Sequence, residues 1–115
     1  MDELVIYHNP RCSKSRRTLE LLVERGLEPR VVEYLKTPPS AIEIRDLLAA
    51  LGRTARQVMR KGEDPYSRLG LDDVDDEATL VQAIHENPIL LERPIVVAGG
   101  RARIGRPPES VLEIL

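Results

Sequence analysis

Cys12 is the single cysteine of this 115-residue chain, and its position indicates a nucleophile. It follows Asn9-Pro10-Arg11, where a predicted strand and turn give way to a predicted helix. A helix N-terminus presents unpaired N–H groups and a partial positive charge, and both favour a thiolate over a thiol. A lone cysteine is more often a small buried core residue, but charged neighbours at a helix cap fit that role poorly. We therefore predict a reactive thiolate.

Four bases accompany this cysteine in sequence, without any acid between residues 7 and 19; they are Arg11, Lys14, Arg16 and Arg17. Cations in the first turn of a helix oppose its dipole, and a local rule broken in this way tends to mark function. We expect the four bases to add positive charge around the Cys12 sulfur.

Two familiar cysteine chemistries fit the spacing poorly. A phosphatase-type loop needs an arginine six positions after its cysteine, where this chain has Thr18. A thiol protease needs a histidine, and the chain has His8 and His85. We expect His85 to be solvated on the outer part of a helix. His8 is compatible with two roles, tuning the pKa of Cys12 or completing a hydrogen bond in the turn.

The tetrad Cys12-Ser13-Lys14-Ser15 has the CxxC spacing of thiol redox enzymes, with serine in the resolving position. Ser15 cannot form a disulfide, but one turn along the helix its hydroxyl could donate a hydrogen bond to the Cys12 thiolate. An adduct on Cys12 would then need an external thiol for its release. A single cysteine also excludes an intrachain disulfide and a Cys-rich zinc site, and we predict no metal.

The bases of the chain are concentrated in three windows that contain no acid. Residues 7–19, 47–62 and 93–108 hold 12 of the 17 Lys and Arg residues, while the acids cluster most densely at residues 72–77. If the three windows converge in the fold, they form an anion site. If they do not, they are three separate solvated faces, and the distribution of charge leaves both possibilities open.

The elements that must position these residues follow from hydrophobic spacing and turn signals. Residues 4–7 and 30–34 are typical of strands, and residues 95–98 and 101–104 of a hairpin around Gly99-Gly100. The helix after Cys12 should end at Gly26, and a last helix should open at Pro107-Pro108. The intervening helices should form an insertion at about residues 40–87.

Cap signals divide this insertion into its helices. Ser40 with Glu43 predicts one helix that ends at Gly52, and Thr54 with Gln57 predicts a short one that runs to Lys61. Residues 63–71 are expected to be a loop, and Asp75 or Asp76 to cap a helix that ends at Asn87-Pro88. The order βαβ, helical insertion, ββα predicts an α/β chain of thioredoxin-like (glutaredoxin-like) fold, forming a single domain over residues 1–115.

The composition of the chain disfavours two classes of function, nucleic-acid binding and membrane insertion. The net charge is −2, and the chain has three Tyr and no Phe or Trp. A generally basic nucleic-acid binder and an aromatic base-stacking surface are therefore disfavoured, and we predict no nucleic-acid partner. The acidic N-terminus is unlike a signal peptide, and no apolar run reaches the length of a membrane-spanning helix. We expect a cytoplasmic protein without membrane partners.

Several motifs, in order from the first strand to the final helix, resemble the glutaredoxin- and glutathione-coupled arsenate reductase family (ArsC family), and especially its short members. The segments that carry the resemblance are Tyr7-His8-Asn9-Pro10-Arg11-Cys12-Ser13-Lys14-Ser15-Arg16, Tyr34-Leu35, Pro38-Pro39, Met59-Arg60-Lys61, Asn87-Pro88-Ile89-Leu90, Glu92-Arg93-Pro94-Ile95-Val96-Val97 and Gly105-Arg106-Pro107-Pro108-Glu109.

The resemblance implies a site and a mechanism. Cys12 would attack the arsenic of arsenate or a similar oxyanion, and Arg60, Arg93 and Arg106 would hold that oxyanion. Glutathione, a co-substrate rather than a bound cofactor, would then attack the adduct and reduce As(V) to As(III), and glutaredoxin would resolve the glutathione-linked intermediate. His8, Asn9 and Ser15 would support Cys12. The family also implies a cis peptide bond at Arg93-Pro94.

Other functions fit the same residues. One is a thiol-dependent oxidoreductase with a substrate other than arsenate, including a general thiol transferase acting on glutathionylated proteins. Another is a thiol-sensing regulator or adaptor, for which residues 72–77 could be the contact face. A charge run of this kind is more often a solvated loop and helix cap.

Overall fold

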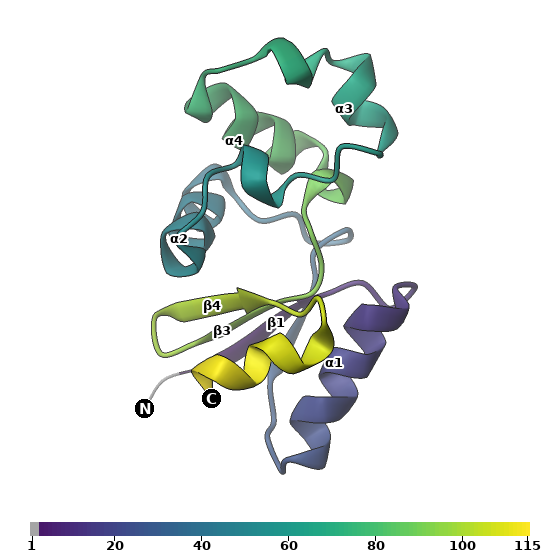
Figure 1. The fold of residues 1–115 in the computed structure, drawn as a ribbon, viewed down its shortest axis with the longest axis vertical. Helices are drawn as coiled ribbons and strands as arrows, with labels where there is room; N and C mark the ends of the chain where they lie inside the picture. The colour runs from purple at the N-terminus through teal and green to yellow at the C-terminus, as the bar shows by residue number, and fades with distance from the viewer. Residues whose placement is uncertain (1–2) are drawn as a thin grey trace. The chain divides into compact units, whose positions relative to one another are not determined.

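One mixed sheet of four strands forms in the computed structural model, which describes residues 3–115. The strands are β1 (Leu4–His8), β2 (Arg30–Glu33), β3 (Ile95–Ala98) and β4 (Arg101–Ile104), in the order β2-β1-β3-β4 (Figure 1). β1 runs parallel to β2 and antiparallel to β3, and β3 pairs antiparallel with β4. The helix α1 (Ser13–Glu24) makes the crossover that the parallel pair needs. This arrangement agrees with the predicted thioredoxin-like α/β fold.

The chain divides into two compact units. The first joins residues up to 37 with residues 93–115, and the second comprises residues 38–92. The sheet and α1 belong to the first unit, together with η4 (Pro108–Ile114). The helical insertion predicted at about 40–87 falls within the second unit, and the single-domain organisation stays a prediction.

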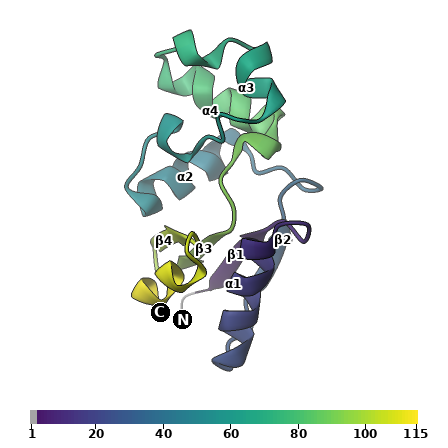
Figure 2. The ribbon, with the colours of Figure 1, turned by 45° about the vertical axis from the view of Figure 1, so that its right-hand side comes forward.

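The core of the first unit lies on one face of the sheet. Ile6 of β1 and Val96 of β3 are opposite each other in the register, and both are fully buried. Leu22 of α1 packs against them together with two residues of η4, so α1 and η4 cover the same face (Figure 2). Burying each such aliphatic side chain stabilises the fold by about 1.5–3 kcal/mol. This core fixes the start of α1 at the end of β1, where Cys12 lies.

A two-glycine turn closes the hairpin of β3 and β4, as predicted. Gly99 and Gly100 have φ values of +58° and +77°, a conformation that residues with a Cβ atom rarely adopt. The turn sets the register that pairs Ile95 with Ile104. The residues directly before β3 and directly after β4 therefore lie together at one end of the sheet.

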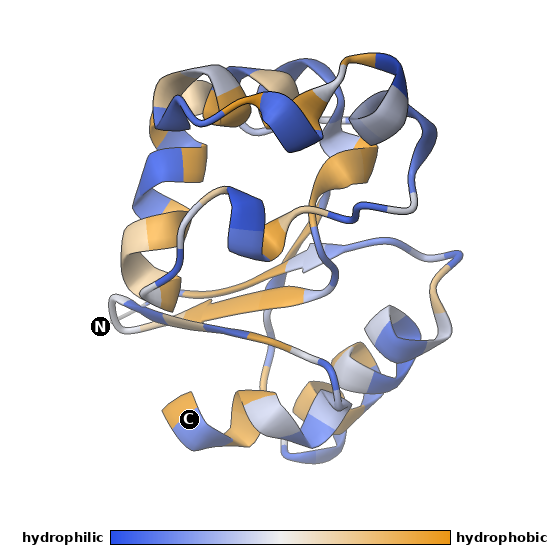
Figure 3. Cartoon of the chain, turned by 45° about the horizontal axis from the view of Figure 1, so that its top comes forward, coloured by the Kyte–Doolittle hydropathy of each residue, from blue (hydrophilic) through white to orange (hydrophobic). Residues whose placement is uncertain are grey.

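The second unit is helical. Its elements are α2 (Ala41–Leu51), η1 (Arg56–Val58), α3 (Asp64–Arg68), η2 (Leu71–Asp73), α4 (Glu77–Glu86) and η3 (Pro88–Leu90). The Ser40 hydroxyl caps α2 by accepting from the Glu43 N–H at 3.1 Å, and Asp76 caps α4 in the same way through Thr79. The two helices pack against each other through their apolar faces, while hydrophilic residues alternate with hydrophobic ones around each helix (Figure 3). No helix among residues 3–115 is both long and apolar enough to cross a membrane.

Three predicted elements were wrong in detail. The short helix after Thr54 ends at Val58 rather than Lys61, because Met59 instead forms a β-bridge with Leu91. Residues 63–71, expected to be a loop, contain α3, a five-residue helix with Pro65 in its first turn. The last helix, η4, is a 3₁₀-helix.

Candidate active site

Cys12 is the N-cap residue of α1, as predicted. Its backbone is extended, with φ −95° and ψ 122°, and the helix begins at Ser13. The Cys12 N–H donates to the Asn9 carbonyl at 3.0 Å, and the Cys12 carbonyl accepts the first helical hydrogen bond, from the Arg16 N–H, at 3.0 Å. The thiol is partly exposed and occupies the place that a capping hydroxyl or carboxylate usually takes.

Two of the three predicted oxyanion-binding arginines lie beside Cys12. Arg106, after β4, places its Nη1 atom 4.0 Å from the Cys12 Sγ. The same nitrogen donates to the carbonyl of Arg93, which precedes β3, at 3.1 Å. The peptide bond Arg93–Pro94 is cis, as the family resemblance implies, and so is Arg106–Pro107.

These surroundings hold the pKa of the Cys12 thiol below its usual value. Partial burial alone would raise that pKa. It is outweighed by the backbone N–H of Ser15, by the hydrogen-bonding and charged guanidinium of Arg93, and by the backbone N–H of Lys14. The two N–H groups are unpaired donors of the helix start, so the local fold and a distant arginine act together on the sulfur.

Gly105 connects β4 to Arg106 by a close approach that only glycine permits. Its N–H donates to the Pro94 carbonyl at 2.9 Å. A Cβ atom at this position would lie 2.6 Å from the Thr18 Oγ1 and 2.8 Å from the Pro94 Cγ, both closer than real contacts allow. Gly105 was not among the predicted site residues; the signal that could have found it is a glycine between the last strand and an arginine of the predicted site.

Ser15 supports the site in a different way from the predicted one. Its hydroxyl is fully buried, forms a 2.6 Å hydrogen bond with the Nδ1 of His8, and accepts from the Asn9 N–H at 3.0 Å. It therefore ties α1 to the end of β1, and the backbone N–H of Ser15, rather than its hydroxyl, favours the thiolate. Of the two roles open to His8, the structure places it in the turn hydrogen bond.

Burial lowers the pKa of the His8 imidazole, although Glu33 opposes this shift. Asn9 is also buried, and its side-chain oxygen accepts from the Arg11 N–H at 3.0 Å. His8, Asn9 and Ser15 thus form a buried polar cluster behind Cys12. Its hydrogen bonds fix the turn that presents Cys12.

The bases next to Cys12 in sequence contribute less than we predicted. Arg17 forms ion pairs with Glu24 at 3.0 Å and Glu20 at 3.5 Å on its own helix, and Arg16 donates to the Pro10 carbonyl at 2.9 Å. The positive charge that lowers the pKa of Cys12 comes instead from Arg93. The first and third acid-free windows therefore do converge.

Arg60 belongs to the second unit, and its predicted place on the oxyanion stays a prediction. Its N–H donates to the Leu90 carbonyl at 2.7 Å. Its guanidinium pairs with Glu63 at 3.3 Å and with Glu92 at 3.5 Å, and about a quarter of the side chain is exposed. Two carboxylates therefore hold the Arg60 side chain in a defined position within this unit.

Other candidate residues have structural roles in the second unit. The His85 Nδ1 bonds the Pro39 carbonyl at 2.8 Å, so this side chain is not simply solvated as we expected. In the acidic run, Asp72 accepts from the Tyr66 hydroxyl at 2.9 Å and Asp76 caps α4. These contacts agree with a loop and helix cap. Among residues 3–115, no three His, Cys, Asp or Glu side chains are grouped so as to hold a metal ion.

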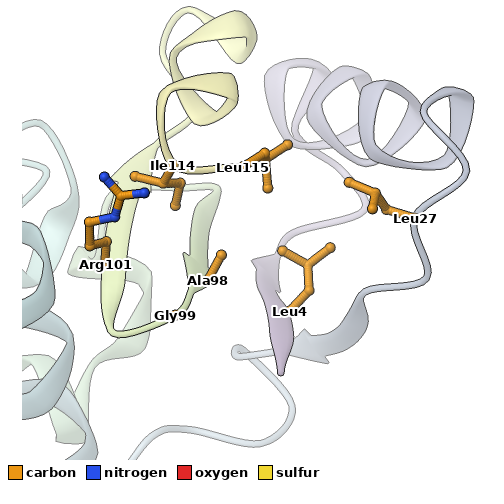
Figure 4. Close-up of a pocket in the computed structure, with 7 residues that line it drawn as sticks. All are labelled: Leu4, Leu27, Ala98, Gly99, Arg101, Ile114 and Leu115. Carbon is orange, nitrogen blue, oxygen red and sulfur yellow. The ribbon is translucent and has the colours of Figure 1, made fainter. Parts of the chain in front are cut away.

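Residues 3–37 and 93–115 of the first unit line two hollows that bear on the site. One, of about 380 Å³, lies at the end of the sheet where β1 begins, far along the strand from Cys12, and none of the predicted site residues lines it. Figure 4 shows its mainly aliphatic walls: Leu4, Leu27, Ala98, Gly99, Arg101, Ile114 and Leu115. The other, of about 210 Å³, adjoins the turn that leads into Cys12.

Comparison with known proteins gives full-length matches. Residues 7–114 match the ArsC family. The Escherichia coli (strain K12) protein YfgD is 60% identical over 98% of this chain and 97% of its own length. An arsenate reductase of Neisseria meningitidis serogroup A is 50% identical over the whole of both chains. The solved structure of an arsenate reductase from Vibrio cholerae, 51% identical over 98% of each chain, superposes with a TM-score of 0.95.

Proposed function

Because this chain belongs to the ArsC family, we propose that it is an oxidoreductase that reduces arsenate to arsenite. Two relatives that carry the name arsenate reductase match it over 98% or more of both chains, so the proposal does not depend on a shared fragment. The observation that carries the proposal is the partly exposed Cys12, whose thiol has a lowered pKa, with Arg106 4.0 Å from its sulfur. A thiolate beside guanidinium groups is suited to attack an anionic electrophile.

In the first step, the Cys12 thiolate attacks the arsenic of arsenate and one arsenate oxygen leaves as water. Arg93 and Arg106 offset the negative charge of the oxyanion and of the covalent adduct, and Arg60 is assigned as the third arginine. Such groups act most strongly where they are already fixed in position. The Arg106 hydrogen bond to the Arg93 carbonyl supplies part of that fixation.

The two electrons for the reduction come from two external thiols. The glutathione thiol attacks the arsenic of the adduct, so that an As–S bond forms and a second arsenic-bound oxygen leaves as water. The glutaredoxin thiolate then attacks the glutathione sulfur, which forms a glutathione–glutaredoxin mixed disulfide and leaves the electron pair of the broken As–S bond on arsenic. Arsenic thereby passes from As(V) to As(III), water hydrolyses the remaining Cys12–arsenic bond, and arsenite and the Cys12 thiolate are released. The serine at position 15 supports this route, because its fully buried hydroxyl cannot replace a resolving thiol.

The test is arsenite formation from arsenate by the purified protein with glutathione and glutaredoxin. We expect turnover that requires both thiols and disappears in Cys12→Ser. The conservative change Arg106→Lys should raise the KM for arsenate while retaining some turnover. A lysine keeps the positive charge but cannot form the bidentate hydrogen bonds that a guanidinium makes to an oxyanion. Full activity in Cys12→Ser, or turnover without either thiol, would contradict the mechanism.

A further inference from the structure

The hollow of about 210 Å³ next to the Cys12 turn has no part in the proposed chemistry so far. Its walls come from the turn after β1 and from the end of β2 with the residues that follow it. The residues that matter for its chemistry are His8, Asn9, Arg11, Glu33, Leu35 and Lys36.

This hollow and the two arginines lie on opposite sides of the strand that leads to Cys12. Arg93 and Arg106 adjoin β3 and β4, whereas Glu33 and Lys36 come from the end of β2. In the sheet order, β1 separates β2 from β3. A molecule in the hollow therefore leaves the oxyanion side of Cys12 free.

The charged groups at the hollow have both signs and lie close together. Lys36 Nζ is 3.4 Å from the Glu33 Oε1, and Arg11 adds a second exposed cation on the facing wall. Burial lowers the pKa of the His8 imidazole, which favours its neutral form. Leu35 adds an apolar wall, with 38% of its surface exposed.

A ligand that matches such a site carries a carboxylate and an ammonium group on neighbouring atoms, as the end of an α-amino acid does. The γ-glutamyl end of glutathione has this chemistry. The hollow is smaller than the 300–1,000 Å³ typical of whole-ligand pockets, so it fits one end of a tripeptide rather than all of it. The remainder could extend past Arg11 to Cys12, the next residue in the chain.

We infer that this hollow binds the γ-glutamyl end of the glutathione co-substrate, with Lys36 and Arg11 at its carboxylate and Glu33 at its ammonium group. The inference rests on the proposed function, since that function supplies the need for a thiol. It adds a separate site for the thiol, on the β2 side of Cys12, so that glutathione approaches an arsenate adduct whose oxygens the arginines already hold.

The direct test is to measure, by titration calorimetry, the binding of S-methylglutathione to the Cys12→Ser protein. This ligand has no free thiol. Lys36→Gln and Glu33→Gln should each weaken binding about two- to fivefold, the usual range for one exposed charge pair. Both side chains are substantially exposed, so the substitutions leave the core intact. Arg68→Gln, which removes an exposed ion-pair partner of Asp64 in α3, is the matched control and should bind as the parent does.

A modified ligand tests the assignment of each charge. Acetylating the γ-glutamyl amino group of S-methylglutathione removes its ammonium group. Glu33→Gln should then cause no further loss of affinity, whereas Lys36→Gln should still weaken binding. Equal affinity of all variants for S-methylglutathione would overturn the inference.

Steady-state kinetics separate this inference from the proposed function. If arsenite forms but the KM for glutathione is unchanged in both Lys36→Gln and Glu33→Gln, the site is wrong and the function stands. If no arsenite forms but S-methylglutathione binding depends on these two residues, the site stands and arsenate is the wrong substrate.

Discussion

The Cys12 thiolate is favoured by groups that act over two very different distances along the chain. The N–H groups of Lys14 and Ser15 come from the same helical turn, whereas Arg93 comes from the far end of the sequence. The local groups are backbone atoms that no side-chain substitution removes. The charge of Arg93 can be changed without altering the turn, so its share is open to measurement.

Arg93→Gln should move the pKa of the Cys12 thiol back toward the ordinary cysteine value of about 8.5, because the variant loses a positive charge and a hydrogen bond to the thiolate. The rate of alkylation by iodoacetamide as a function of pH reports this pKa. The midpoint should lie below that of an ordinary cysteine in the parent protein and closer to it in the variant. Arg101→Gln, at the start of β4, should leave the midpoint unchanged.

Ser15→Ala distinguishes the observed role of the hydroxyl from the predicted one. The change leaves the buried Asn9 N–H without its acceptor, so we expect a loss of about 1–3 kcal/mol in the free energy of unfolding. The pKa of Cys12 should move less than in Arg93→Gln, because the backbone N–H of Ser15 remains. Denaturant titration and the alkylation profile measure the two effects, with the exposed Ser13→Ala as control. A large pKa change without destabilisation would restore the original prediction.

At the scale of elements, the position of Arg106 depends on the close contact of Gly105 with Thr18 and Pro94. The end of β4 passes α1 and the start of β3 at Gly105, where Thr18 and Pro94 leave no room for a side chain. The proposed oxyanion site is therefore sensitive to a residue that carries no functional group.

Gly105→Ala should destabilise the fold by about 1–3 kcal/mol, the usual cost of overpacking, and should displace Arg106 from Cys12. The measurements are thermal unfolding and the KM for arsenate, which we expect to rise. Gly62→Ala is the control, since a Cβ atom there meets nothing within 4 Å and its φ is not in the left-handed region. Equal behaviour of the two variants would show that Thr18 and Pro94 yield easily.

Elements with local sequence signals could be predicted, and those made by distant contacts could not. The Ser40 cap and the Gly99-Gly100 turn depend on residues within a few positions, and both were correct. The short helix η1 does not continue past Val58, because Met59 pairs with Leu91 in a β-bridge. The local sequence does not indicate this contact. Short helices such as α3 lack the turns that make a hydrophobic period visible.

The site residues likewise fall into those that the local sequence predicts and those that it does not. Cys12 at a helix start was predictable because strand, turn and helix are consecutive in sequence. The closeness of Arg93 and Arg106 to it came only from the family resemblance. The Ser15 hydroxyl was placed wrongly because the sequence does not show that the Asn9 N–H is buried beside it.

At the scale of the whole molecule, the buried His8 links the free energy of unfolding to pH. In the folded chain burial lowers the pKa of its imidazole, whereas in the unfolded chain it takes up a proton near pH 6.5. Between these two values the unfolded chain binds more protons, so acid favours unfolding. The contribution of His8 is present above pH 6.5 and is lost as the pH falls through the lower, folded-state pKa.

The free energy of unfolding should therefore decrease between pH 7 and pH 5.5, measured by urea titration at several pH values. His8→Gln removes the titrating group and should flatten this part of the profile, even though it lowers stability overall. Carrying out both series in the Cys12→Ser background removes any contribution from the thiolate. An equally steep profile in His8→Gln would mean that another group causes the decrease.

The place of Cys12 as the N-cap of α1 has a reciprocal consequence. The start of the helix stabilises the thiolate, and the thiolate stabilises the start of the helix by the same free energy, because linkage between two equilibria is symmetric. Each time the sulfur loses its negative charge, the N–H groups of Lys14 and Ser15 lose an acceptor. The chemical state of the Cys12 sulfur thereby affects the stability of the first turn of α1, and this stability would decrease and recover in each turnover.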